Sequence, residues 1–129
     1  MLLTVTSTYG QQHDNVWTFG YTCVPGDSST FGGTNLYFDD EIRGEYHCRD
    51  IRFGGNLTTS ISDREGNLKL MFNGCTLNNA NNEIVEGNEL LVRNDTNIEQ
   101  TWWCDDGYNT PHGAMFLPDP YDENRYYLF

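Results

Sequence analysis

The sequence predicts an all-β protein, and residues 58–75 carry the clearest evidence for that fold class. Two extended segments flank a polar turn that contains a Gly-Asn pair, and Leu68, Leu70 and Phe72 occupy alternate positions after it. Alternation with a period of two around such a turn is typical of a β-hairpin with one buried face. Aromatic residues, which are enriched in strands, make up 14% of the chain. No convincing segment places apolar residues at helical spacing, so long helices are not expected.

The 129 residues are enough for one domain with a single core. Strands are expected at 15–21, 35–38, 57–73 (as a hairpin), 113–118 and 125–129. Residues 39–50 are ambiguous, 78–82 form a turn-rich cluster, 84–92 are partly extended and 94–110 form a long loop. The first hairpin strand and the strand at 113–118 are about 55 residues apart, close to one four-stranded propeller blade with a long insertion.

The charge of the chain excludes some partners. Seven basic residues against nineteen acidic ones give a net charge of −12. Such a field repels phosphate backbones and anionic lipid, so binding to nucleic acid is not expected. No stretch approaches the roughly 20 apolar residues of a membrane helix, so membrane insertion is not expected either.

Cation binding is the more specific alternative explanation of the acidic composition, because Ca²⁺ takes six to eight oxygen ligands, which carboxylates can supply. The acidic candidates for such ligands are Asp105, Asp106, Asp119, Asp122 and Glu123. They lack the spacing of a calcium loop, and acidic turns that keep the protein soluble are the simpler interpretation. No cofactor other than calcium is considered.

The two ends of the chain predict a fragment. Residues 1–11 have the composition of the tail of a secretory signal, without its basic start. Residues 12–129 then form the domain. The chain stops in a strand-forming segment, 125–129, and the absence of a following turn would leave an apolar edge unpaired. We therefore expect a domain truncated at its carboxy terminus.

Residues 62–68, which lead into 71–75, resemble a repeated signature of large secreted proteins of the Bacteroidota. In that family the segment Asp-x-x-Gly-Asn-Leu-Leu-Phe-Tyr-Thr-Asn-Gly forms the outer hairpin of a propeller blade. Further similar segments follow in the same order as in the family: 15–20, 31–38, 112–120 and 126–129. The resemblance covers residues 12–129, and the chain departs from it in a shortened aromatic run before Asn73 and Gly74.

This resemblance implies an incomplete β-propeller of one to two blades with long loops. It also implies export through a signal peptide, and a carboxy-terminal domain for type IX secretion that this chain lacks. The protein would be secreted or at the cell surface, and one partner would be the rest of its own propeller.

Four well-separated cysteines, Cys23, Cys48, Cys75 and Cys104, indicate an oxidising compartment rather than a zinc ribbon. Three disulfide connectivities are open, and four buried thiols are the alternative. We predict a Cys75–Cys104 disulfide, because the end of the hairpin and the tryptophan-containing loop leave the sheet one after the other and are expected on the same face. The Cys23–Cys48 pair then follows by elimination.

No specific catalytic motif occurs. The three histidines, His13, His47 and His112, are far apart, and no Gly-x-Ser-x-Gly segment is present. The carboxylates Glu41, Glu45 and Asp50 could act in a glycosidase, but any acidic chain offers such groups by chance. The chain is therefore not predicted to be an enzyme.

The predicted binding residues are Trp102, Trp103 and Tyr108 in the long loop. Exposed aromatic rings stack on sugar faces and anchor protein partners. The alternative is that one tryptophan packs under the loop beside a Cys104 disulfide. The sequence thus predicts a non-catalytic binding or adhesion module for a glycan or surface protein. The alternative function is the start of a secreted carbohydrate-active hydrolase with its catalytic residues beyond residue 129.

Overall fold

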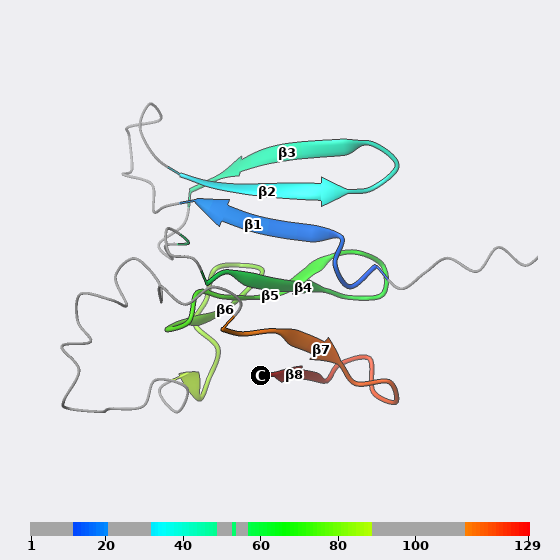
Figure 1. Cartoon of the computed structure of the whole chain (residues 1–129), viewed down its shortest axis with the longest axis vertical. Helices are drawn as coiled ribbons and strands as arrows, with labels where there is room; N and C mark the ends of the chain where they lie inside the picture. The colour runs from blue at the N-terminus through cyan, green and yellow to red at the C-terminus, as the bar shows by residue number, and fades with distance from the viewer. Residues whose placement is uncertain (1–11, 21–31, 49–52, 54–56, 89–112) are drawn as a thin grey trace, which may run out of the picture.

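The part of the chain that the structure describes is built from β-strands, as the sequence predicts (Figure 1). The computed structural model describes residues 12–20, 32–48, 53, 57–88 and 113–129. These residues contain eight strands and no α-helix. Within these ranges no helix is long and apolar enough to cross a membrane.

The strands form three small antiparallel sheets in chain order. The first sheet consists of β1 (Val16–Gly20), β2 (Gly33–Phe38) and β3 (Ile42–His47). The second consists of β4 (Thr59–Ser62), β5 (Leu68–Phe72) and β6 (Leu77–Asn79). The third consists of β7 (Phe116–Pro118) and β8 (Tyr126–Leu128). Each strand pairs with its neighbour in the chain, so the topology is a series of meanders.

The predicted hairpin at 57–73 is confirmed as β4 and β5. Ile61 pairs with Leu70, and the register shifts between Ile61 and Ser62. Apolar alternation predicted this hairpin because the face of β5 that carries Leu70 and Phe72 packs in the core. The strand expected at 15–21 is β1, the one at 35–38 lies within β2, and those at 113–118 and 125–129 contain β7 and β8.

Two strands, β3 and β6, were not predicted. All but the last residue of β3 are exposed, so β3 lacks the apolar alternation that identifies a half-buried strand. It is instead an outer strand of its sheet, held by its pairing with β2. The short β6 begins in what the sequence indicated as a turn-rich cluster. The extended segment expected from residue 84 is reduced, over residues 84–88, to one isolated bridge between Ile84 and Asn78.

The predicted propeller is not shown by the structure. Over the described residues the three sheets stay open and form no closed ring. What the structure establishes is the coarser prediction, an all-β chain of small antiparallel sheets.

The second sheet lies between the other two and packs apolar side chains on both sides (Figure 1). Toward the third sheet, Ile61 and Phe72 pack with Phe116, and Tyr126 and Leu128 of β8 join this cluster. On the other face of β5, the fully buried Met71 packs on Phe53, which bridges to Gly20 of β1. Each buried side chain of this size stabilises by about 1.5–3 kcal/mol, so the first cluster holds the second and third sheets together. The second cluster covers the other face of β5 and connects to the first sheet through the bridge of Phe53 to Gly20.

The three hairpins share one construction. An aspartate directly follows the first strand of each: Asp39 after β2, Asp63 after β4 and Asp119 after β7. Each carboxylate forms an ion pair with a basic side chain further along its hairpin: Arg43 at 3.2 Å, Lys69 at 3.2 Å and Arg125 at 3.6 Å, respectively. Figure 1 shows the three turns on the same side of the molecule. The hairpins are therefore a structural repeat.

The Asp63 turn shows why aspartate suits this position. Its Oδ1 accepts the main-chain N–H groups of Glu65 and Asn67, at 3.1 and 2.8 Å. Its own N–H donates to the Asn67 carbonyl at 2.8 Å. A short side-chain acceptor that bonds the main chain two residues ahead preorganises a turn, which is why aspartate and asparagine favour such positions.

The buried side chain of Asn15 joins the first sheet to the second. Its amide donates to Asp39 Oδ1 at 2.8 Å and to the Gly66 carbonyl at 3.2 Å. Gly66 has a φ of +85°, and a methyl group added there would lie 2.8 Å from Asn15 Nδ2. The sequence therefore needs glycine at 66 for its backbone conformation and for the approach of Asn15.

We predict that Gly66→Ala destabilises the protein more than Gly87→Ala. Both glycines have nearly the same positive φ, +85° and +84°, so each alanine costs about 1–2 kcal/mol of backbone strain. Only at Gly66 does the new methyl group meet other atoms, which adds about 1–3 kcal/mol. Urea unfolding of the two variants measures the difference. Equal losses would show that the Asn15 contact does not constrain the turn.

Candidate functional site

A cleft opens along the seam between β1 and the chain that leads into β4. Phe53 N donates to the carbonyl of Gly20, the last residue of β1, at 2.7 Å, and the bridge between these two residues is antiparallel. Ser62 N, at the end of β4, donates to the carbonyl of His13, just before β1, at 2.8 Å. Between these bonds Ser60 Oγ donates to the Val16 carbonyl at 2.7 Å, so a side chain also joins β4 to β1.

The cleft has a volume of about 200 Å³, and its lining is aromatic and hydroxylic. The lining residues are Trp17, Thr18, Phe19, Thr58, Thr59 and Ser60. Half of the Trp17 surface is exposed, and its ring lies edge-on to that of Phe19 at 6.4 Å. None of the described residues that line the cleft is charged. Its chemistry is thus apolar ring faces next to neutral hydrogen-bonding groups.

Thr18 lies at this seam with its side chain buried. The carbonyls of Val16 and Gly20 face the β4 side, and alternation along the strand directs the main-chain groups of Thr18 the same way. The side chain of Thr18 lies on the face of β1 opposite to Trp17 and Phe19. The main-chain groups of Thr18 are therefore the part of this residue that faces the seam.

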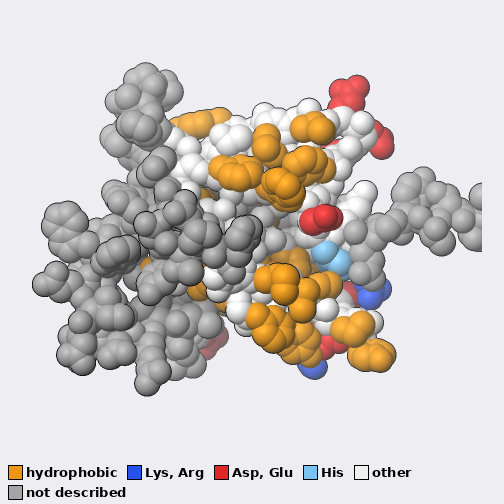
Figure 2. Space-filling model, viewed as in Figure 1, with side chains coloured by type: hydrophobic (Ala, Val, Ile, Leu, Met, Phe, Trp, Pro, Cys, Tyr) orange, Lys and Arg blue, Asp and Glu red, His pale blue; other side chains and the backbone are white. Residues whose placement is uncertain are grey.

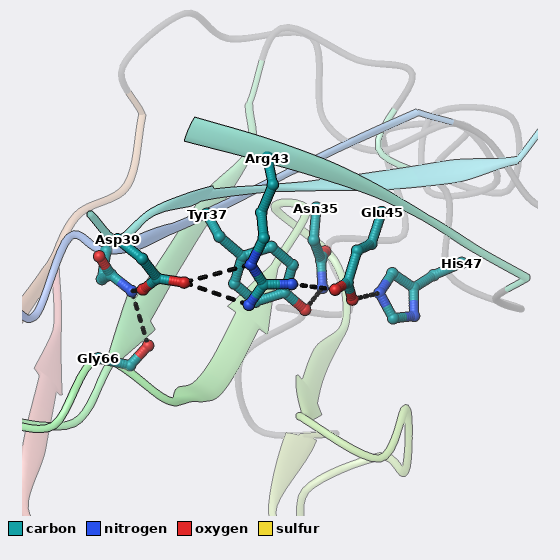
Figure 3. A network of polar contacts seen from close by, with 8 residues as sticks. Asn35, Tyr37, Asp39, Arg43, Glu45, His47 and Gly66 are labelled. Atoms are coloured by element: carbon teal, nitrogen blue, oxygen red, sulfur yellow. Dashed lines mark hydrogen bonds and ion pairs between the residues drawn. The ribbon is translucent and has the colours of Figure 1, made fainter. Parts of the chain in front are cut away.

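A second polar feature is the row of side chains across β2 and β3 (Figure 3). Arg43 pairs with both Asp39 and Glu45, and its guanidinium lies 4.0 Å from the centre of the Tyr37 ring. Glu45 also lies 3.6 Å from His47 Nε2. Arg43 pairs with both carboxylates, so the row holds the β2–β3 hairpin in shape, and each carboxylate of the row is engaged.

Glu41, Glu45 and Asp50, considered as glycosidase carboxylates but not predicted to be catalytic, form no shared site among the described residues. Glu45 is engaged by Arg43, Glu41 is exposed in the β2–β3 turn, and Asp50 lies outside the described residues. The histidines behave similarly. His13 Nδ1 lies 2.7 Å from the Ser62 carbonyl, His47 belongs to the polar row, and His112 is outside the described residues.

The candidate calcium ligands are only partly described. Asp105 and Asp106 lie outside the described residues. Asp119 accepts the Tyr121 N–H at 2.8 Å and the Tyr127 hydroxyl at 2.7 Å, and Arg125 lies near both Asp119 and Asp122. In the described ranges no three His, Cys, Asp or Glu side chains gather so that they could hold a metal ion. The sequence prediction of no cofactor, with calcium as the alternative, is therefore not tested by these residues.

The three residues predicted for binding, Trp102, Trp103 and Tyr108, lie outside the described residues, and so do Cys23 and Cys104. Of the described cysteines, Cys48 and Cys75, neither is a free thiol. Each predicted disulfide joins one described cysteine to one outside the described residues, so the connectivity stays a prediction.

The sequence did not predict the cleft residues as a binding site, although one part of the pattern, the alternation along the first strand, was recognisable. Alternation correctly placed Trp17 and Phe19 on one face of a strand. A strand taken alone does not reveal whether that face is core or surface. The partners Thr58, Thr59 and Ser60 come from about forty residues further along the chain, and no local pattern connects them to Trp17.

Comparison with known proteins yields no relative: no family model, curated protein or solved structure matches the chain.

The turn aspartates have lowered pKa values because the folded chain stabilises their charge. For Asp119 the largest cause is the hydrogen bond from the Tyr121 N–H, followed by that from the Tyr127 hydroxyl. For Asp39 it is the hydrogen bond from Asn15, with Arg43 adding to it. Burial raises the pKa of Asp63, but bonds from Asn67 and Lys69 outweigh this and lower it overall.

We predict that acid destabilises the protein through these carboxylates. A folded-state pKa below the ordinary value of 3.8 gives stability that is present above about pH 4 and is lost as pH falls through the folded pKa. Asp119→Asn should therefore lower the free energy of unfolding at neutral pH, and its difference from wild type should shrink below pH 4. Urea unfolding across this pH range measures both. Glu123→Gln, at an exposed turn position, is the control, and a difference that stays constant below pH 4 would contradict the assignment.

Proposed function

We propose that this protein is a non-catalytic binding module that recognises a glycan, with the cleft between β1 and β4 as its site. The observation that carries the proposal is the half-exposed indole of Trp17 beside the hydroxyl-bearing Thr58, Thr59 and Ser60. Aromatic rings present an apolar face with a defined geometry, and hydroxyl groups act as both donors and acceptors. A sugar ring has the complementary chemistry, an apolar face edged by hydroxyls.

The size and charge of the cleft support a small neutral ligand group. Its volume of about 200 Å³ is below the roughly 300 Å³ at which pockets for drug-sized ligands begin, so it accommodates one ring. The described lining residues carry no charge, which favours a neutral sugar over an acidic one.

The wider context of the proposal is a secreted or cell-surface protein with propeller-like architecture. The repeated hairpins with their turns on one side, and the packing of the second sheet against the third, support a blade-like arrangement. In a longer protein the rest of the propeller would be an intramolecular partner. The export route by type IX secretion and the two disulfides belong to this proposal, because both follow from an extracellular location.

The loop residues Trp102, Trp103 and Tyr108 remain the second part of the proposed binding surface. Loops on a rigid scaffold are where recognition usually resides. The alternative function, the start of a carbohydrate-active hydrolase, would place the catalytic residues outside the described part of the chain. No observation on the described residues favours it.

We predict that Trp17→Ala lowers glycan affinity at least about tenfold while the fold is retained. Loss of a stacking platform removes apolar contact with the ring, and each tenfold change corresponds to about 1.4 kcal/mol. A screen of neutral glycans with the full chain identifies a ligand, and calorimetry measures its affinity for the variant. Thr58→Val, which removes a hydroxyl with little change in shape, tests the hydrogen-bonding side of the cleft.

The matched control is Tyr46→Ala, because Tyr46 is an exposed aromatic residue of the same sheet outside the cleft. Trp102→Ala and Trp103→Ala test the loop surface in the same assay. Undiminished binding by Trp17→Ala would remove the cleft from the proposal. Hydrolysis of a glycan by the wild-type chain would contradict the non-catalytic assignment itself.

A further inference from the structure

The outer edge of β3 is open in the part of the chain that the structure describes. Among the described strands β3 pairs only with β2, and Figure 1 shows it at the margin of the molecule. Soluble proteins commonly protect such an edge with a proline, a bulge or a very short strand. The six residues of β3 contain no proline, and their register with β2 is unbroken. This edge is therefore competent to pair with another strand.

The main-chain groups of three residues point out of the edge. Phe38 N donates to the Asn15 carbonyl at 2.9 Å, so the main chain of Phe38 faces β1. Because main-chain direction alternates in an antiparallel ladder, its pairing partner Ile42 turns its N–H and carbonyl away from β2. The same holds for every second residue of β3, which adds Gly44 and Tyr46. These three residues offer donors and acceptors to another strand.

The sequence around Gly44 is complementary to itself when it is read in the opposite direction. Residues 41–47 are Glu-Ile-Arg-Gly-Glu-Tyr-His. In an antiparallel pair centred on Gly44 of two copies, Arg43 of each copy lies opposite Glu45 of the other. In the same register Ile42 lies opposite Tyr46. Opposite charges therefore face each other on one side of the sheet, and apolar side chains face each other on the other side.

This register also matches the alternation of the main-chain groups. Ile42, Gly44 and Tyr46 fall at hydrogen-bonded positions, where each facing pair exchanges two main-chain bonds. Arg43 and Glu45 fall at the positions between them, where facing side chains approach most closely. Side-chain charge and main-chain hydrogen bonding thus select the same alignment.

We propose that two copies of this chain associate through β3, antiparallel and centred on Gly44, so that their first sheets form one continuous sheet. The charges identify a second copy as the occupant of the edge. A shift by two residues is the smallest that keeps outward main-chain groups facing each other. It places Arg43 opposite Arg43, or Glu45 opposite Glu45, and like charges in facing positions are destabilising. Larger shifts pair fewer outward groups.

The side chains that would meet are accessible on both sides of the sheet. Arg43 and Glu45 each keep nearly half of the side chain exposed, and Arg43 is held over the Tyr37 ring in the polar row of Figure 3. Ile42 and Tyr46 are exposed members of the hydrophobic group that Figure 2 shows over the first sheet. A contact related by a twofold axis uses the same surface of both copies, so association stops at a dimer.

The first test measures the mass of the whole chain by sedimentation equilibrium over a range of concentrations. Physiological ionic strength is used because it screens the repulsion between two acidic chains. We expect a reversible monomer–dimer equilibrium and nothing larger. Gly44→Pro removes an outward N–H and leaves the pairing with β2 intact, so it should weaken the dimer at least about tenfold.

Gly44→Ala is the matched control for the proline. A methyl group at position 44 would have Leu36 Cδ2 as its nearest neighbour, at 3.4 Å, and the backbone there has no positive φ. Alanine therefore fits and keeps the N–H, and this variant should dimerise like the wild type. Circular dichroism of both variants checks that the fold is retained.

Charge reversal tests the register and does not depend on the proline variant. Arg43→Glu and Glu45→Arg each place like charges opposite each other, so each variant alone should dimerise at least about tenfold more weakly. In a mixture of the two, opposite charges face each other again, and a heterodimer about as tight as the wild-type dimer should form. Arg64→Glu makes the same charge change in the β4–β5 turn and should leave association unchanged.

Three outcomes would overturn the proposal. A wild type that is monomeric at every concentration would leave the edge to another strand of a longer chain or to a different protein. A dimer that Gly44→Pro does not weaken uses another surface, and a mixture that does not regain association excludes the register. None of the substituted residues lines the glycan cleft, which lies at the β1 edge of the sheet. Association and glycan binding are therefore scored separately.

Discussion

The contact on which the rest of the structure depends is the packing of the second sheet between its neighbours. Sheets of two or three strands with three to six residues each cannot stand alone in water, so each must bury a face against another. Phe72 and Met71 are adjacent in β5 and therefore point to opposite faces, which lets one strand hold the neighbouring elements on both sides. The same constraint explains why the end sheets each keep one apolar face uncovered.

The distribution of charge follows from that layered packing. The two apolar clusters contain no charged side chain, and the three turn aspartates lie outside them. There these aspartates act locally: Asp63 and Asp119 accept main-chain N–H groups and pair with a basic side chain further along the hairpin, which helps to define where the chain reverses. Part of the negative charge therefore serves to build the hairpins.

The candidate binding cleft arises from incomplete pairing between neighbouring sheets. Where β1 meets the chain before β4, main-chain hydrogen bonds form at the ends and the Ser60 hydroxyl bridges the middle. Thr18 lines this cleft together with an exposed indole and several hydroxyl groups. The same hydrogen bonds therefore fix the two sheets relative to each other and shape the opening of the cleft.

The sequence by itself determined the all-β class, the β4–β5 hairpin and the common face of Trp17 and Phe19, because these depend on local alternation and turn chemistry. It did not reveal β3, whose exposed residues have no apolar period, and its predicted site at Trp102, Trp103 and Tyr108 lies outside the described residues. Only the tertiary structure decided that the Trp17 face is solvent-exposed and that Thr58 to Ser60 lie beside it. The reason is physical: burial and the seam between β1 and β4 are set by contacts between segments about forty residues apart, which local patterns do not encode.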